Sequence, residues 1–259
     1  MFLKEFIAVI FNFLYPQSLN KGSILMYHSI GKNKKFSTVT PKNFERQLCF
    51  LKNNGYMLTS LSNLISKIKN KEDISRHVSI TFDDGYEDFY TSAYPLLIKY
   101  KIPATVFVPT AFVGSSILVS QGNDEFPVMT RDQIKEIADK GLVEIMPHSV
   151  HHKKLTQMTF EDATKEIEDS RKGVEMITGI SSQIFAYPSG KYTMEIVEYL
   201  RKSMIWISAV TVNPGLVSAG GDLFILNRNS IDSEVGMQQF RMKISDAIEL
   251  YIKISKWVK

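Results

Sequence analysis

The feature of this sequence that most constrains its fold is an alternation of short apolar runs with amphipathic helical stretches from Ser23 onward. Strand-like runs at residues 78–82 and 104–108, for example, flank a stretch at 93–100 that is predicted to be helical. Strands that alternate with helices through short connections form parallel sheets, which are either open or closed into a barrel. The chain is therefore expected to have an α/β fold.

The remaining elements follow from the same signals. Thr40 caps a helix that Pro41 opens, and a long helix begins at Thr159 and ends near Gly179. The other predicted segments are helices at 61–68, 130–141 and about 237–257, and strands at 24–27, 143–146, 184–187, 206–212 and 223–226. Because no Pro/Gly/Ser-rich linker divides them, residues 23–259 are predicted to form one domain that closes on a C-terminal helix.

Composition limits the class of protein. With 259 residues, 44% of them hydrophobic, the chain can bury a sizeable core without disulfides. Its near-average composition excludes disordered, collagen-like and coiled-coil proteins. Its one cysteine excludes an internal disulfide framework and a metal site built from several thiolates. A formal net charge of +4 is mild and does not single out nucleic acid, so we expect no nucleic-acid partner.

The first 22 residues are expected to form a separate apolar N-terminal segment. Its unbroken apolar run, residues 6–11, is far shorter than the ~20 residues that span a bilayer. Glu5 and the lack of an A-x-A pattern at residues 17–19 argue against a cleaved secretion signal. We expect a short helix that packs on the domain or lies at a membrane surface. This favours a cytoplasmic or membrane-peripheral location, with a secreted or cell-envelope location as the alternative.

Polar residues cluster where predicted strands end, which is where the sites of α/β proteins form. Residues 78–82 lead directly into Asp83 and Asp84, followed by Gly85. Two adjacent carboxylates after a buried strand repel each other and lose solvation, so a metal ion is the most economical compensation. The alternative is an ordinary turn, since Asp-Gly is common turn chemistry.

Three of the five histidines follow the strand predicted at residues 143–146. His148 and His152 are four residues apart, so one helical turn would present both on one face, with His151 pointing elsewhere. Two imidazoles and a carboxylate can hold a metal ion and leave positions open for water and substrate. The cluster therefore favours a metal site; its alternative is a surface loop that contains histidines by chance.

Two other strand ends carry weaker signals. The strand predicted at 184–187 runs into Pro188, Ser189 and Gly190, a tight turn whose backbone N–H groups could hold an oxyanion. His28 follows the first apolar strand. A lone histidine after a strand is usually structural, and the interest of His28 is that it is the remaining histidine at a strand end.

In their order along the chain, three motifs resemble those of the NodB-type polysaccharide deacetylases, carbohydrate esterase family four. They are Thr81-Phe82-Asp83-Asp84-Gly85-Tyr86, His148-Ser149-x-x-His152 and Phe185-Ala186-Tyr187-Pro188-x-Gly190. The resemblance covers roughly residues 23–231. It implies a distorted (β/α) barrel and a divalent metal, commonly zinc, with cobalt or nickel as alternatives.

The resemblance also implies roles for individual residues. Carried over by position, Asp84, His148 and His152 would be the metal ligands and Asp83 the catalytic base. The backbone N–H of Ser189 would help to hold the oxyanion.

Two positions depart from the family pattern. Ala186 stands where the third motif usually begins with an arginine that steadies the base, and Arg228 stands where a Leu-x-His pattern usually supplies an acid histidine. His28 resembles the acid histidine of the subgroup that includes the poly-N-acetylglucosamine deacetylases, in which it comes from the N-terminal strand. Because the first and last strands of a barrel are neighbours, we expect His28 to be the general acid and Arg228 to replace the missing arginine beside Asp83.

The function implied by the resemblance is metal-dependent removal of N-acetyl groups from an amino-sugar glycan, with release of acetate. The glycan would be poly-N-acetylglucosamine-like, a chitooligosaccharide or another cell-envelope polysaccharide. One alternative is the same chemistry on a lipid-linked sugar, an O-acetyl ester or a small cyclic amide; another is a non-catalytic carbohydrate-binding relative. The expected partners are the N-acetylated glycan and, through residues 1–22, a membrane surface, and the protein is expected to be a monomer.

Overall fold

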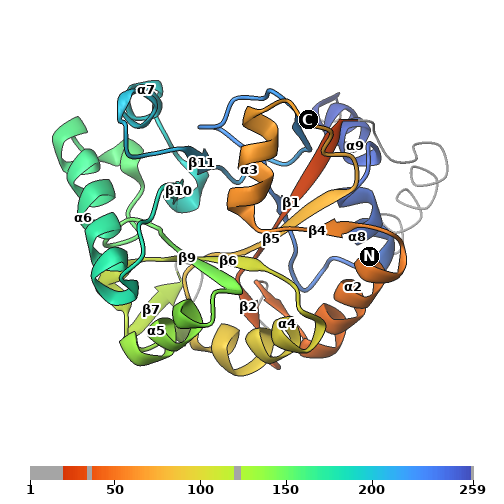
Figure 1. The fold of residues 1–259 in the computed structure, drawn as a ribbon, viewed down its shortest axis with the longest axis horizontal. Helices are drawn as coiled ribbons and strands as arrows, with labels where there is room; N and C mark the ends of the chain where they lie inside the picture. Colours follow the sequence, from red (N-terminus) through yellow and green to blue (C-terminus); the bar gives the residue numbers. More distant parts are fainter. Residues whose placement is uncertain (1–19, 34–36, 120–123, 258–259) are drawn as a thin grey trace.

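Four parallel strands form the centre of the fold (Figure 1), in the order β1 (Lys21–Tyr27), β5 (His77–Phe82), β6 (Ala104–Val108) and β9 (Val143–Pro147). The structure is a computed structural model that describes residues 20–33, 37–119 and 124–257. Three short strands extend this sheet: β4 (Met57–Leu58) beside β5, and β12 (Val217–Ser218) and β13 (Asn229–Ser230) beside β1. Of these pairings, only that of β12 is antiparallel.

A second, two-stranded parallel sheet continues the curve of the first. It consists of β10 (Ile184–Ala186) and β11 (Ser208–Val210). Val210 forms a parallel bridge with Leu226, and three residues later β13 pairs with β1. The segment from Leu226 to β13 therefore connects β11 back to the first strand.

The ring of strands is interrupted between β9 and β10. There, side chains make the connection: the Ser182 hydroxyl donates to the Ile145 carbonyl at 3.3 Å, and the His148 Nδ1 lies 2.8 Å from the Ala186 carbonyl. A ring of parallel strands with one such gap is a distorted barrel, so the predicted fold is confirmed.

Most of the helices lie around the outside of the strands in Figure 1. Those between strands are α2 (Pro41–Asn53), α3 (Leu61–Lys69), α4 (Tyr94–Tyr100, entered through a π-helical turn at Phe89–Ala93), α5 (Arg131–Asp139), α6 (Phe160–Thr178) and α7 (Met194–Lys202). The chain then forms α8 (Met237–Lys243) and α9 (Ala247–Trp257). Two small two-stranded sheets lie in the loops: β2 (Ser29–Ile30) pairs with β3 (Thr38–Val39), and β7 (Ser116–Val119) pairs with β8 (Asp124–Pro127).

Successive residues of β5 face two different environments. Val78, Ile80 and Phe82 pack outward into the larger hydrophobic core, which they share with α2, α4 and α5. Because side chains alternate along a strand, Ser79 and Thr81 face into the ring. The inward face of β5 is thus polar, and the residue that continues it after the strand ends is Asp83.

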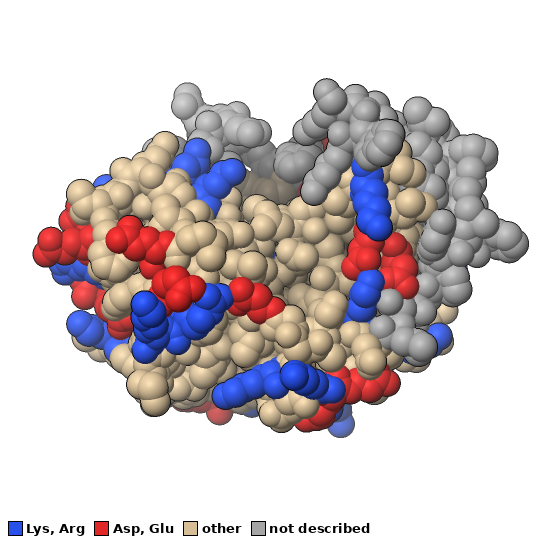
Figure 2. Space-filling view, turned by 90° about the horizontal axis from the view of Figure 1, so that it is seen from above, with Lys and Arg blue, Asp and Glu red and all other residues tan. Residues whose placement is uncertain are grey.

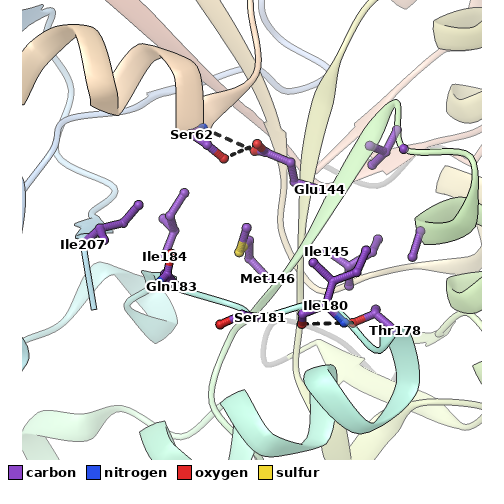
Figure 3. Close-up of a pocket in the computed structure, with 13 residues that line it drawn as sticks. Ser62, Glu144, Ile145, Met146, Thr178, Ile180, Ser181, Gln183, Ile184 and Ile207 are labelled. Carbon is purple, nitrogen blue, oxygen red and sulfur yellow. Dashed lines mark hydrogen bonds between the residues drawn. The ribbon is translucent and has the colours of Figure 1, made fainter. Parts of the chain in front are cut away.

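Helix α3 closes the end of the ring at which the strands begin. Its buried Leu61, Leu64, Ile65 and Ile68 join a second core with inward-facing residues of β1, β6, β9, β10 and β11. At the same end, Glu144 accepts hydrogen bonds from Ser62 (Figure 3), beside a largely apolar cavity of about 250 Å³, and it also accepts one from the Thr105 hydroxyl. Because apolar side chains fill the ring where the strands begin, its polar groups lie at the end where the strands finish.

Several predicted elements differ from those observed. Residues 223–226 are not a strand: the Asp222 carboxylate accepts the Phe224 N–H at 3.0 Å and forms a turn, and the strand is β13, farther along. The predicted C-terminal helix is two helices, α8 and α9, separated where Ser245 bonds back to the Met242 carbonyl. Helix α7 and the β7–β8 hairpin were not predicted.

The N-terminal prediction falls mainly outside the described residues. Residues 1–19 are among those not described, and Lys21 and Gly22 already belong to β1. Within the described ranges, no helix combines the length and apolar character needed to cross a membrane.

Candidate active site

The residues that follow the central strands meet at the end of the ring where those strands finish. Tyr27 of β1 pairs with Phe82 of β5, so the next residues, His28 and Asp83, continue the two strands side by side. The Asp83 N–H donates to the Tyr27 carbonyl at 3.0 Å. On β9 the alternation that turns Met146 inward also turns His148 inward. Strand geometry therefore gathers these polar side chains at one place.

Arg228 forms a two-pronged ion pair with Asp83. Its Nη1 donates to Oδ1 at 2.6 Å and its Nη2 to Oδ2 at 2.7 Å, and both side chains are almost fully buried. The structure thus brings together two residues that are 145 positions apart in the sequence. Arg228 lies in the segment between Leu226 and β13, which joins the last strands of the ring to the first.

Three further groups hold the Arg228 guanidinium. Its Nε donates to the Thr211 carbonyl at 2.8 Å, and its Nη1 also donates to the Thr81 hydroxyl at 3.2 Å. The guanidinium lies over the Phe107 ring, 5.4 Å from its centroid. A planar guanidinium held in this way presents two parallel N–H groups to one carboxylate.

This arrangement controls the ionisation of Asp83. Burial by itself would raise the pKa of this carboxyl. The charge of Arg228 opposes burial most strongly, followed by His148, the hydrogen bonds from Arg228 and His28, and together they hold the pKa well below its usual range. Asp83 is therefore a buried carboxylate that stays ionised at neutral pH.

Replacing Arg228 with Gln is expected to destabilise the metal-free protein by about 3–5 kcal/mol at pH 7, because it leaves the Asp83 charge buried without a partner. The depressed pKa of Asp83 stabilises the wild-type fold above the unfolded pKa of ~3.9, and this contribution is lost as the pH falls through the lower folded value. The difference between variant and wild type should therefore shrink toward low pH.

Urea unfolding of chelator-treated protein at pH 7 and at pH 2.5, below the unfolded pKa of ~3.9, measures this difference. Arg201→Gln is the matched control, since Arg201 forms partly exposed ion pairs with Glu198 and Asp222 that should contribute little. Equal losses of stability for the two variants at pH 7 would contradict the expectation.

Asp84, His148 and His152 form a second group next to the ion pair. One ligand atom from each lies within 4.8 Å of the other two. Asp84 Oδ1 is 3.7 Å from His148 Nε2 and 3.4 Å from His152 Nε2. These distances suit three ligands around one ion better than hydrogen bonds between them.

The chemistry of these three residues fits a divalent metal. Asp84 Oδ1 is buried and, among the described residues, is one of three such side-chain atoms that lack a hydrogen-bond partner. His148 Nδ1 lies against the Ala186 carbonyl, which leaves Nε2 as the free ligand nitrogen. Burial lowers the pKa of His148 to about 4, so its imidazole is neutral at pH 7, as a metal ligand must be.

The two histidines converge by a different local geometry from the one predicted. Residues 148–152 form a loop and not a helical turn. Ser149 and His152 have left-handed backbone conformations, with φ of 60° and 52°, and the Ser149 hydroxyl accepts the His152 N–H at 3.0 Å. The prediction of a helical turn was therefore wrong. His151 does point away: its Nδ1 contacts Glu166 at 2.6 Å.

The two remaining predicted residues lie at the same end of the ring. His28 is half-buried at the end of β1. Ser189 is exposed in the turn after β10 and has a φ of 53°. The next residue must be glycine, because a Cβ on Gly190 would lie 2.3 Å from a methyl group of Val212. Since the Ala186 carbonyl contacts His148, this turn is tied to the second group.

Sequence reasoning missed the residues that support these groups. Thr211 and Thr81 orient Arg228. Thr211, which directly follows β11, does so through its main-chain carbonyl, so its side chain gives no signal in the sequence. Glu166 had a signal that could have been used: it is a charged residue among the buried positions of α6, next to Ala163, Ile167 and Ser170.

Comparison with known proteins places this arrangement in a family. A family model described as Polysaccharide deacetylase matches residues 70–205, more than half of the chain. The YxkH protein of Bacillus subtilis (strain 168) is 34% identical over 209 residues, which cover 80% of this chain and 70% of that protein. The poly-beta-1,6-N-acetyl-D-glucosamine N-deacetylase of Staphylococcus aureus is 28% identical over 209 residues, covering 77% and 70%.

A solved structure agrees with these matches. The Streptococcus pyogenes deacetylase PplD, determined in complex with acetate, is similar with a TM-score of 0.75 and 29% identity, over 88% of this chain and 99% of that one. The sequence matches and the structural match therefore indicate the same family. The chain belongs to the polysaccharide deacetylase family and is a deacetylase of the hydrolase class.

Proposed function

We propose that this protein removes N-acetyl groups from the amino-sugar residues of a glycan and releases acetate. The glycan is poly-N-acetylglucosamine-like, a chitooligosaccharide or another cell-envelope polysaccharide. The observation that carries the proposal is the unpartnered Asp84 oxygen between two imidazoles, next to the Asp83–Arg228 ion pair. The substrate class is supported by the relative in Staphylococcus aureus, which is named as a poly-beta-1,6-N-acetyl-D-glucosamine N-deacetylase.

Asp84, His148 and His152 would hold a divalent metal in this proposal, most simply zinc, with cobalt or nickel as alternatives. Such an ion supplies Lewis-acid polarisation of the acetyl carbonyl and makes water easier to deprotonate at neutral pH. The remaining chemistry belongs to the side chains around it.

Asp83 is the proposed general base. It accepts a proton from the attacking water, while Arg228 keeps both of its oxygens in a fixed orientation. The Ser189 N–H donates to the carbonyl oxygen as negative charge develops there. His28 donates a proton to the amide nitrogen as the C–N bond breaks. The new C–O bond and the broken C–N bond yield acetate and a free amino sugar.

Replacing His28 with Ala is expected to slow deacetylation of an N-acetylated sugar by about 10²–10⁴-fold, because an amine is a poor leaving group unless it is protonated. Hydrolysis of 4-nitrophenyl acetate, whose leaving group needs no proton, should fall far less. Steady-state kinetics on both substrates give this ratio. An N-acetyl rate near that of the wild type would exclude His28 as the acid.

The proposed function is tested by acetate release from a panel of acetylated compounds after chelation and metal add-back. We expect metal-restored activity on N-acetylated glucosamine oligomers. The alternatives are represented by acetyl xylan, a lipid-linked N-acetyl sugar and small cyclic amides. Preference for any of these would replace the proposed substrate, and activity that survives full chelation would overturn the metal dependence.

A further inference from the structure

Glu166 contacts the loop that carries the two histidines. It lies on α6 with only 9% of its surface exposed, among buried residues such as Ala163, Ile167 and Ser170. A carboxylate is costly at such a position unless hydrogen bonds compensate for its lost solvation. Its bonding partners therefore indicate why it is there.

Within the described ranges, the hydrogen bonds of Glu166 all go to residues between His148 and His152. One oxygen, Oε2, accepts the main-chain N–H groups of Val150 and His151, each at 2.9 Å. The other oxygen, Oε1, lies 2.6 Å from His151 Nδ1. Glu166 thus binds the two peptide groups at the centre of the loop through a single carboxylate.

The other loop contacts engage different groups. The carbonyls of Ser149 and Val150 accept N–H groups from Thr110 and Ala111, at 3.2 and 3.0 Å. The Ser149 hydroxyl accepts the His152 N–H. Glu166 is therefore the partner of the Val150 and His151 N–H groups, and no other residue in the described part of the chain accepts them.

The conformation that Glu166 holds is one that the loop would not adopt unaided. Ser149 and His152, on either side of the bound N–H groups, have positive φ values. Left-handed residues other than glycine are disfavoured and persist where surrounding contacts determine them. This same conformation brings the imidazole of His152 to 3.4 Å from Asp84.

We propose that Glu166 is a positioning residue of the metal site: by binding the Val150 and His151 N–H groups, it fixes the loop that presents His152 to Asp84 and His148. The inference rests on the metal site of the proposed function and extends it beyond the three ligands. Glu166 itself does not touch substrate or metal. Its removal should weaken metal binding by roughly 10–100-fold, the range found when outer hydrogen-bond partners of metal ligands are lost.

The test measures the dissociation constant of Co²⁺ from its visible absorbance, in wild type and in three variants of the full chain. Glu166→Ala should weaken binding and alter the Co²⁺ absorption bands. Glu166→Gln should restore most of the affinity, because the amide oxygen can still accept both N–H groups. His151→Ala should bind almost as tightly as wild type, since the main-chain bonds remain.

A control separates this role from a general contribution to folding. Asp169→Ala removes another acidic residue of α6, one whose ion pairs with Lys165 and Lys172 lie on the exposed side, and should leave the Co²⁺ affinity unchanged. Amide hydrogen exchange of metal-free protein should be faster at Val150 and His151 in Glu166→Ala and normal in Glu166→Gln.

The outcomes distinguish the proposals. An unchanged Co²⁺ affinity in Glu166→Ala, with normal binding by the wild type, would overturn the role of Glu166 and leave the proposed function standing. A loss in Glu166→Gln as large as in Glu166→Ala would also contradict the main-chain mechanism. Absence of Co²⁺ binding by the wild type would overturn the metal site itself.

Discussion

The Asp84→Asn variant is expected to lose metal-restored acetate release and to bind Co²⁺ more than ~100-fold more weakly than the wild type. Loss of a residue that only hydrogen-bonds to a metal ligand weakens metal binding by up to ~100-fold. Asp84 would be a ligand itself, so its loss should have a larger effect. Asn is chosen over Ala because Asp84 has a φ of 69°, a conformation that Asn tolerates better than most residues. Isothermal titration with Co²⁺ and an acetate assay measure the two effects.

The fold of this variant should be intact. Asp84 Oδ1 has no hydrogen-bond partner and Asp84 is adjacent to the ionised Asp83, so removing its charge should not lower the thermal stability of the metal-free protein. The control is Asp139→Asn, which alters an exposed ion pair with Lys135 on α5 and should change neither property. Wild-type Co²⁺ affinity in Asp84→Asn would remove Asp84 from the ligand set.

The candidate site could be located from the sequence because its residues stand where strands end. Asp83 and Asp84 follow β5 directly and His148 follows β9 directly, so recognising two buried strands also predicts which side chains meet. His28 was expected at the site from the family resemblance and from the closure of a barrel; in the structure it continues β1 beside Asp83, because β1 and β5 pair in parallel up to the preceding residue. Strand order and the alternation of side chains along each strand therefore determine where most of the site residues lie.

What the sequence could not predict depends on contacts between distant residues. The family resemblance led us to expect Arg228 beside Asp83, and the structure shows that ion pair. Local spacing alone would not have predicted it, because the pairing depends on the path by which the chain after β11 crosses back to β1, through the bridge at Leu226 and β13. The left-handed Ser149 depends on partners in α6 and in the loop after β6. A helical turn was a reasonable expectation for residues four apart, yet tertiary hydrogen bonds determined the loop.

The Asp83→Asn variant is expected to retain Co²⁺ binding and to lose about 10²–10⁴-fold in deacetylation rate, because the amide cannot accept the proton of the attacking water. Co²⁺ titration and steady-state kinetics at the same pH measure the two properties. Loss of turnover with retained metal would distinguish the role of Asp83 from that of Asp84, because replacing Asp84 should remove both metal binding and turnover.

The ion pair with Arg228 complicates this experiment and also provides its control. An amide at residue 83 leaves a fully buried guanidinium without its countercharge, which costs about 3–5 kcal/mol in the free energy of unfolding. The double variant Asp83→Asn/Arg228→Gln removes both charges, so its loss of stability should be clearly smaller than the sum of the two single losses.

If Asp83 is the base, the double variant must stay as inactive as Asp83→Asn although it recovers stability. Recovery of activity along with stability would mean that the single variant failed through misfolding, and Asp83 would lose its role as the base.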